Sequence, residues 1–158
     1  MANTKNTISS CSKVSLRKIT EETAKNICKL PVKPEQRNFF HNNAALVIVH
    51  AYFLKNVWLR AIYADETPVG ILTLENDAKK PKYFLTRFMI GSRYQNMGFG
   101  SQAVKLLIKY VKTRPNATEV LLNVNDENSG AIAFYEKLGF KLTGEYLKPS
   151  SAVMKYTF

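Results

Sequence analysis

The feature that most constrains the fold is a strand, glycine loop, helix and second strand over residues 82–124. Residues 82–90 are rich in aromatic and aliphatic side chains, which is typical of a strand. After a loop with two glycines, the apolar residues of 100–112 recur with the 3.6-residue period of a helix. Residues 119–124 form a second short apolar run. Because such crossovers are almost always right-handed and join parallel strands, the passage predicts a βαβ unit.

The loop inside this unit is a candidate pyrophosphate site. Gly98 and Gly100 let the backbone approach a ligand without a Cβ atom in the way. The first N–H groups of the following helix have no intrahelical acceptor and lie at the positive end of its dipole. The same glycines also fit an ordinary strand-to-helix turn. The chain has no G-x-x-x-x-G-K-[ST] motif, and Ala103 stands where G-x-G-x-x-G requires its last glycine, so P-loop and dinucleotide folds are disfavoured.

The remaining elements predict an α+β (mixed α/β) fold. It has a single central, mixed and mostly antiparallel sheet of about seven strands, with helices on both faces. The apolar run within a helical stretch over residues 34–54 predicts a buried helical arm. Further strands are expected over residues 14–19, 57–64, 69–74, 140–147 and 151–157, and further helices over 20–30 and 128–138.

The length and composition favour one domain. The chain has 158 residues and is 46% hydrophobic, which is enough to bury a core. We expect a disordered tail over residues 1–12 and a single domain over 13–158. Cys11 and Cys28 form no C-x-x-C motif and are interpreted as reduced thiols. With no signal-like or membrane-spanning segment, the sequence predicts a cytoplasmic protein.

The net charge of +11 favours polyanionic partners, such as a phosphate-bearing cofactor, an acidic surface or nucleic acid. No block of five like charges occurs, so nucleic-acid binding is not the preferred interpretation. A metal site is not expected, since no His or Cys pair has ligand spacing. His41 is interpreted as a loop residue, His50 as a hydrogen-bonded core residue and Cys28 as a buried small side chain.

Two motifs carry a resemblance to a known family. They are Gln95-x-x-Gly98-x-Gly100 and Asn128-x-x-Ala131-x-x-Phe134-Tyr135-x-x-x-Gly139-Phe140. In this order and separation they resemble the paired cofactor motifs of the GNAT superfamily of N-acetyltransferases, over residues 83–147. Residues 33–39 and 87–90 are similar to the bacterial spermine/spermidine (diamine) acetyltransferase branch.

This resemblance implies acetyl-CoA as cosubstrate. The acetyl-CoA would lie between the strand ending near Ile90 and the strand over 119–124, and its pyrophosphate would rest on the amides of residues 95–101. Arg93 could help to bind the phosphates. The implied cofactor-binding residues are Phe88, Met89, Ile90, Gln95, Asn96, Met97, Gly98, Phe99, Gly100, Ser101, Asn128 and Lys137.

The resemblance also implies that Tyr135 protonates the leaving thiolate. A phenol keeps its proton at neutral pH and can donate it, although from the residues alone Tyr135 fits core packing as well. Relatives of the polyamine type commonly have a carboxylate at the position of Thr86. The possible general base is therefore Glu75 or a water held between the two diverging strands, and no dedicated base is needed if some of the amine is already unprotonated. Glu75 also fits an ordinary solvated strand end.

The expected acceptor is a small-molecule primary amine, with a polyamine as the leading named substrate. Thr86 and the net charge of +11 weaken that assignment, because a polycation needs an acidic pocket. Other small amines or a protein amine also fit. The alternative function is a non-catalytic basic module that binds nucleic acid or senses CoA. Exposed sheet edges in such folds make a homodimer possible.

Overall fold

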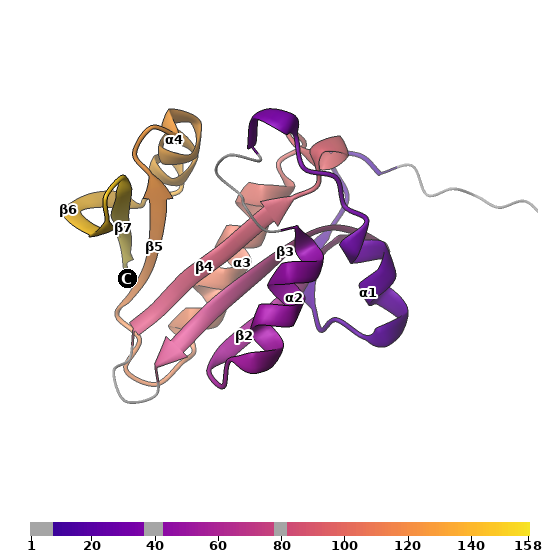
Figure 1. The fold of residues 1–158 in the computed structure, drawn as a ribbon, viewed down its shortest axis with the longest axis horizontal. Helices are drawn as coiled ribbons and strands as arrows, with labels where there is room; N and C mark the ends of the chain where they lie inside the picture. The colour runs from indigo at the N-terminus through magenta and orange to yellow at the C-terminus, as the bar shows by residue number, and fades with distance from the viewer. Residues whose placement is uncertain (1–7, 37–42, 78–81) are drawn as a thin grey trace, which may run out of the picture.

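The computed structural model describes residues 8–36, 43–77 and 82–158. Figure 1 shows its helices and strands along the chain. In order these are β1 (Val14–Arg17), α1 (Glu21–Cys28), the 3-10 helix η1 (Pro34–Gln36), α2 (Ala44–Phe53), β2 (Val57–Ala64), β3 (Thr67–Asp77), β4 (Lys82–Ile90), the 3-10 helix η2 (Ser92–Tyr94), α3 (Phe99–Lys112), β5 (Glu119–Asn125), α4 (Ser129–Lys137), β6 (Lys141–Lys148) and β7 (Ser151–Thr157).

The strands form one sheet in the order β1-β2-β3-β4-β5-β7-β6. Every neighbouring pair is antiparallel except β4 and β5, which are parallel. Helix α3 packs on one face with the larger core cluster, and α1 and α2 pack on the other, as Figure 1 shows. The predicted fold class, a mixed and mostly antiparallel sheet with helices on both faces, is confirmed.

Local sequence signals explain where several elements begin and end. Thr20 and Thr23 form a capping box at the start of α1, which satisfies two otherwise unpaired N–H groups. Asn43 caps α2 through a bond from Leu46 N to its Oδ1 atom (3.0 Å). After α4 the chain reverses at Gly139, which has φ = 96°, a conformation that favours glycine.

Helix α2 corrects one prediction. The apolar run over residues 44–54 was expected to be buried, but only Ala44 and Val47 are buried in the helix. The opposite side is exposed, at Leu46, Val49, Tyr52 and Phe53. A hydrophobic sequence does not say how much of a helix's circumference is covered, and α2 packs along one side only.

Two single-residue predictions on these helices are also wrong. His50 is exposed on α2 and is not a core residue. Cys28 is exposed at the end of α1, because the neighbouring Ile27 takes the position that faces the core and successive helical residues are about 100° apart. Cys11 and Cys28 are both free cysteines.

Parts of the expected tail and arm lie outside the described residues, namely 1–7 and 37–42, with His41 among them. Residues 9–12 form a turn in which Ser12 N donates to Ser9 O at 2.9 Å. Strand β3 is longer at both ends than the predicted range of 69–74. None of the helices in the described ranges combines the length and the apolar character needed to cross a membrane.

Candidate active site

The site begins where the two parallel strands stop pairing. Strands β4 and β5 share only the pairs Tyr83 with Val120, Phe84 with Leu121 and Leu85 with Leu122. Beyond these, β4 continues along β3 as far as Ile90, while β5 continues along β7 as far as Asn125. Figure 1 shows β4 and β5 close together at one end and diverging toward the other. The divergence leaves the facing edges of both strands without a strand partner among the described residues.

A β-bulge lies at the start of this divergence. Thr73 of β3 pairs with Arg87, while the next residue, Leu74, pairs with Leu85. Thr86 is therefore an extra residue in β4, and such a bulge increases the local twist of a strand. The twist carries the end of β4 away from β5.

The loop after β4 presents a row of backbone donors. Gly98 precedes α3 with φ = 81° and provides no side-chain cap. No acceptor in the described part of the chain receives the N–H groups of residues 95–101, and the first helical bond in this region runs from Gln102 N to Gly98 O at 3.2 Å. A Cβ atom added at Gly98 would meet nothing within 4 Å. The geometry suits a bound pyrophosphate at the positive end of α3.

The side chains of this loop contact neighbouring parts of the protein and hold the loop in place. Gln95 Nε2 donates to Ile90 O at 2.9 Å and to Gln36 Oε1 at 2.8 Å, which ties the loop to the end of β4 and to η1. Phe99 is fully buried, and Met97 packs against the core. The predicted contribution of these residues to cofactor binding can therefore come from their backbone, while Asn96, at φ = 62°, is exposed.

Aromatic side chains connect β4 to α4 on the α3 face of the sheet. The Phe88 ring lies 6.0 Å from Phe134 and 6.4 Å from Tyr135. The Tyr135 ring also packs edge-on against Phe134 at 5.0 Å and Phe140 at 5.5 Å. A Cβ atom at Gly100 would lie 3.4 Å from Phe134 and 3.5 Å from Phe88. The second motif is thus brought to the glycine loop.

Tyr135 is 9% exposed. Its hydroxyl makes no hydrogen bond to another described residue. Burial raises the pKa of Tyr135 above its ordinary value, because an ionised phenolate would lose solvation. The phenol is thus neutral over the physiological range and able to donate its proton.

The other predicted site residues have simple local roles. Asn128 Oδ1 accepts from Ala131 N at 3.1 Å, so the residue caps α4 as expected. Lys137 in the last turn of α4 and Arg93 in η2 are exposed cations. Met89 is buried on the α1 and α2 face, whereas the side chain of Ile90 packs against the core on the α3 face.

A hollow lies on the α2 face of the sheet, beside the bulge. It has a volume of about 100 Å³ and contains the predicted base Glu75. Thr86 and Thr73 share its wall, and their hydroxyl oxygens are 2.9 Å apart. The lining residues are Val47, His50, Ala51, Leu54, Val57, Thr73, Glu75, Thr86 and Arg87. The hollow brings a carboxylate and two hydroxyls to the point where β4 leaves β5.

Sequence reasoning missed two residues of this region. Thr73 is 3% exposed in an otherwise apolar stretch of β3. The available signal was a polar residue between two leucines, since a buried hydroxyl needs a hydrogen-bond partner. Gln36 has no such signal, since its bond to Gln95 joins residues 59 positions apart.

Comparisons with known proteins identify the family of this chain. The model of the acetyltransferase (GNAT) family matches residues 19–140. The chain is 24% identical over 140 residues to a spermine/spermidine N(1)-acetyltransferase of Bacillus subtilis, covering 84% of this chain and 90% of that protein. It is 25% identical over 134 residues to a 5-NmdU N-acetyltransferase of Pseudomonas phage PaMx11, covering 85% and 91%.

Solved structures share the fold. The crystal structure of spermidine N-acetyltransferase from Vibrio cholerae, in complex with CoA and spermine, superposes with a TM-score of 0.74 at 16% identity, covering 91% of this chain and 95% of that one. The family match spans most of the chain and includes both motifs around Gly98 and Tyr135. The chain therefore belongs to the GNAT family of acetyltransferases.

Proposed function

We propose that this protein transfers an acetyl group from acetyl-CoA to a primary amine, by direct attack within a ternary complex. The observation that carries the proposal is the row of N–H groups over residues 95–101, which have no acceptor in the described chain and lie at the end of the unpaired edge of β4. Such donors at a helix N-terminus bind phosphate groups, including a pyrophosphate. The proposal needs no metal.

The chain supplies separate surfaces for the parts of the cosubstrate. The loop at Gly98 would bind the pyrophosphate, and the backbone of β4 at residues 88–90 would pair with the pantetheine amides. The thioester would then lie near the bulge at Thr86, with Tyr135 on the opposite side of the strand. Arg93 and Lys137, both exposed, would add weak attraction for phosphates in solution.

In the proposed reaction, the acid Tyr135 acts from the α3 face of the sheet and the base Glu75 from the α2 face. The neutral amine nitrogen attacks the thioester carbonyl carbon, and the carbon–sulfur bond breaks as the amide bond forms. Tyr135 gives its proton to the leaving sulfur and regains one from solvent. Glu75, in the α2-face hollow, accepts the proton that the amine nitrogen loses. A carboxylate within reach of the nitrogen, directly or through one water, suits this role.

The acceptor is proposed to be a small primary amine, and a polyamine is the leading named candidate. Support comes from the names of the Bacillus relative and the Vibrio structural neighbour. The described lining of the α2-face hollow contains one carboxylate, Glu75, beside the cation Arg87. A single ammonium is therefore matched better than a chain of several.

A second candidate acceptor is an amine carried by a nucleic acid base. The name of the phage relative, 5-NmdU N-acetyltransferase, supports it. The net charge of +11 also supports it, because a basic protein attracts a polyanionic substrate.

The decisive experiment measures free thiol released from acetyl-CoA with spermidine, spermine, aminoglycosides, amino acids, basic peptides and aminomethyl-uracil DNA. Amine-dependent release with one class, together with a thermal shift from acetyl-CoA alone, would establish activity and acceptor class. Binding of acetyl-CoA without release in any arm would favour a CoA sensor. No shift and no release, with salt-dependent retention on DNA, would favour the non-catalytic basic module.

Free thiols at Cys11 and Cys28 support a cytoplasmic setting. The oligomeric state of the protein in the assay sample would show whether it is a homodimer.

A further inference from the structure

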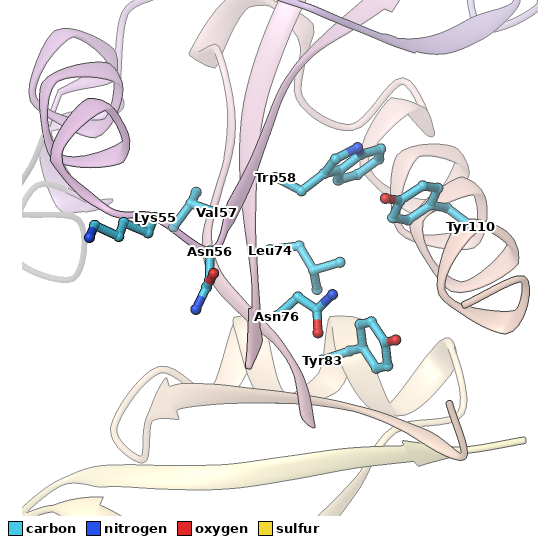
Figure 2. Close-up of a pocket in the computed structure, with 8 residues that line it drawn as sticks. All are labelled: Lys55, Asn56, Val57, Trp58, Leu74, Asn76, Tyr83 and Tyr110. Atoms are coloured by element: carbon cyan, nitrogen blue, oxygen red, sulfur yellow. The ribbon is translucent and has the colours of Figure 1, made fainter. Parts of the chain in front are cut away.

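A larger cavity lies on the α3 face at the opposite end of β4 from the glycine loop. Its volume is about 270 Å³. Leu74 and Tyr83, which are 1% and 3% exposed, form its buried floor. Figure 2 shows the lining residues Lys55, Asn56, Val57, Trp58, Leu74, Asn76, Tyr83 and Tyr110. Since β4 runs from Lys82 to Ile90, at 3.3 Å per residue roughly 25 Å of strand separate this cavity from the loop.

Two of the walls belong to a stacked column of four side chains. The rings of Trp58 and Tyr110 are parallel within 9° at 4.0 Å. The Arg60 guanidinium lies 4.4 Å from the Trp58 ring, and the Arg114 guanidinium lies 4.6 Å from the Tyr110 ring. Both faces of each ring are therefore covered, and only ring edges remain to line the cavity.

This column affects the sign of the charge on a ligand that the cavity can bind. Aromatic faces attract cations, but here two guanidinium groups already occupy them. Aromatic edges carry positive potential and favour oxygen atoms or electron-rich ring faces. None of the described lining residues is an acid, and Glu75 lines the hollow on the other face. A polyamine is thus disfavoured, and an anionic or electron-rich ligand is favoured.

The polar groups at the cavity indicate which class of ligand it can bind. The amide of Asn76 lies between Leu74 and Tyr83, whereas the side chains of Lys55 and Asn56 lie across the strands from these residues, and Lys55 extends away from them (Figure 2). A side-chain amide offers both donors and an acceptor, which match the edge of a nucleobase. The apolar floor at Leu74 and Tyr83 suits a flat ring. The volume is just below that of drug-sized pockets, so the ligand is compact.

We propose that this cavity binds a nucleobase, with the base against Leu74, Tyr83 and Asn76. The site is separate from the proposed acetyl-CoA site and does not depend on acetyl transfer. The same base could come from a free nucleotide or from the end of a single-stranded nucleic acid, and both sources share this chemistry.

The test uses the single tryptophan of the chain, Trp58, as a direct reporter. The full-length protein is titrated with AMP, UMP, adenosine, a short single-stranded oligonucleotide and spermidine, and Trp58 emission is followed. We expect a saturable change with AMP, UMP, adenosine or the oligonucleotide, and no change with spermidine. Saturating acetyl-CoA is expected to leave the AMP titration unchanged.

Asn76→Ala is expected to weaken AMP binding by about fivefold, the effect of one hydrogen bond. The matched change Asn26→Ala, on the exposed surface of α1, is expected to have no effect. Neither variant should alter thiol release from acetyl-CoA. No saturable signal with any nucleotide, a signal abolished by acetyl-CoA, or an equal response to spermidine would overturn the proposal.

Discussion

The hydroxyl oxygens of Thr86 and Thr73 lie 2.9 Å apart, across strands β4 and β3. The Thr86 hydroxyl is also 3.4 Å from the Thr73 carbonyl oxygen. The bulge in β4 creates this pair, because Thr86 is the residue that has no register partner on β3. Both threonines line the α2-face hollow that contains the proposed base, Glu75.

Thr86→Glu is expected to improve the use of polyamines. The new carboxylate would add a second negative charge to the hollow that holds Glu75. Since a partly exposed ion pair contributes up to about 1 kcal/mol, KM for spermidine should fall about fivefold. Steady-state kinetics with Thr86→Gln as the uncharged control would check it. An equal gain in the glutamine variant would show that charge is not responsible.

Glu75→Gln tests the proposed base. The amide keeps the shape of the side chain but cannot accept the proton from the amine, so kcat/KM for the amine should fall about a hundredfold. Affinity for acetyl-CoA, measured by calorimetry, should stay the same. Glu22→Gln on the exposed side of α1 is the matched control. Unchanged turnover of Glu75→Gln would assign the proton to water.

Tyr135→Phe tests the proposed acid. Removing the hydroxyl leaves the ring contacts with Phe134 and Phe140 in place, so acetyl-CoA affinity should change less than about twofold, while kcat falls about a hundredfold. Stopped-flow thiol release separates chemistry from binding. Wild-type rates in this variant would leave Tyr135 with a packing role only.

The raised pKa of Tyr135 predicts how stability depends on pH. The unfolded tyrosine ionises near pH ~10, whereas burial keeps the folded phenol protonated to higher pH. The contribution is therefore complete below pH ~10 and is lost above it, at about 1.4 kcal/mol per pH unit. Urea unfolding between pH 9 and 11 should show a steeper loss for the wild type than for Tyr135→Phe. Parallel curves for the two proteins would contradict the prediction.

Gly98→Ala is expected to destabilise the protein by about 1 to 2 kcal/mol through backbone strain. An added Cβ atom would meet no other atom within 4 Å, so the left-handed φ of 81° is the whole cause. The thermal shift produced by acetyl-CoA should also shrink, because the loop donors would be displaced. Gly130→Ala, at a helical position where the nearest atom is 3.8 Å away, is the control and should not destabilise.

Local signals in the sequence were sufficient for much of the fold. Residues 82–90 have the same bounds as β4, and Asn128 and Gly139 frame α4 as expected. In these places the defining interactions join residues a few positions apart, such as Asn128 and Ala131. The glycine loop was found for the same reason.

Features that depend on distant residues were not predicted. The Thr73 and Thr86 pair needs the register and the bulge of two strands, which no local pattern specifies. The exposed outer side of α2 was interpreted as buried because its composition is apolar throughout. Burial depends on which elements reach a helix, and α2 packs mainly against α1, β2 and β3.

The two parts of the sheet are joined by three paired positions between β4 and β5. A ligand that hydrogen-bonds along β4 beyond Leu85 would act as an inserted strand and reinforce this narrow seam. Occupancy of the proposed site would then govern how firmly residues 119–158 are attached to the rest.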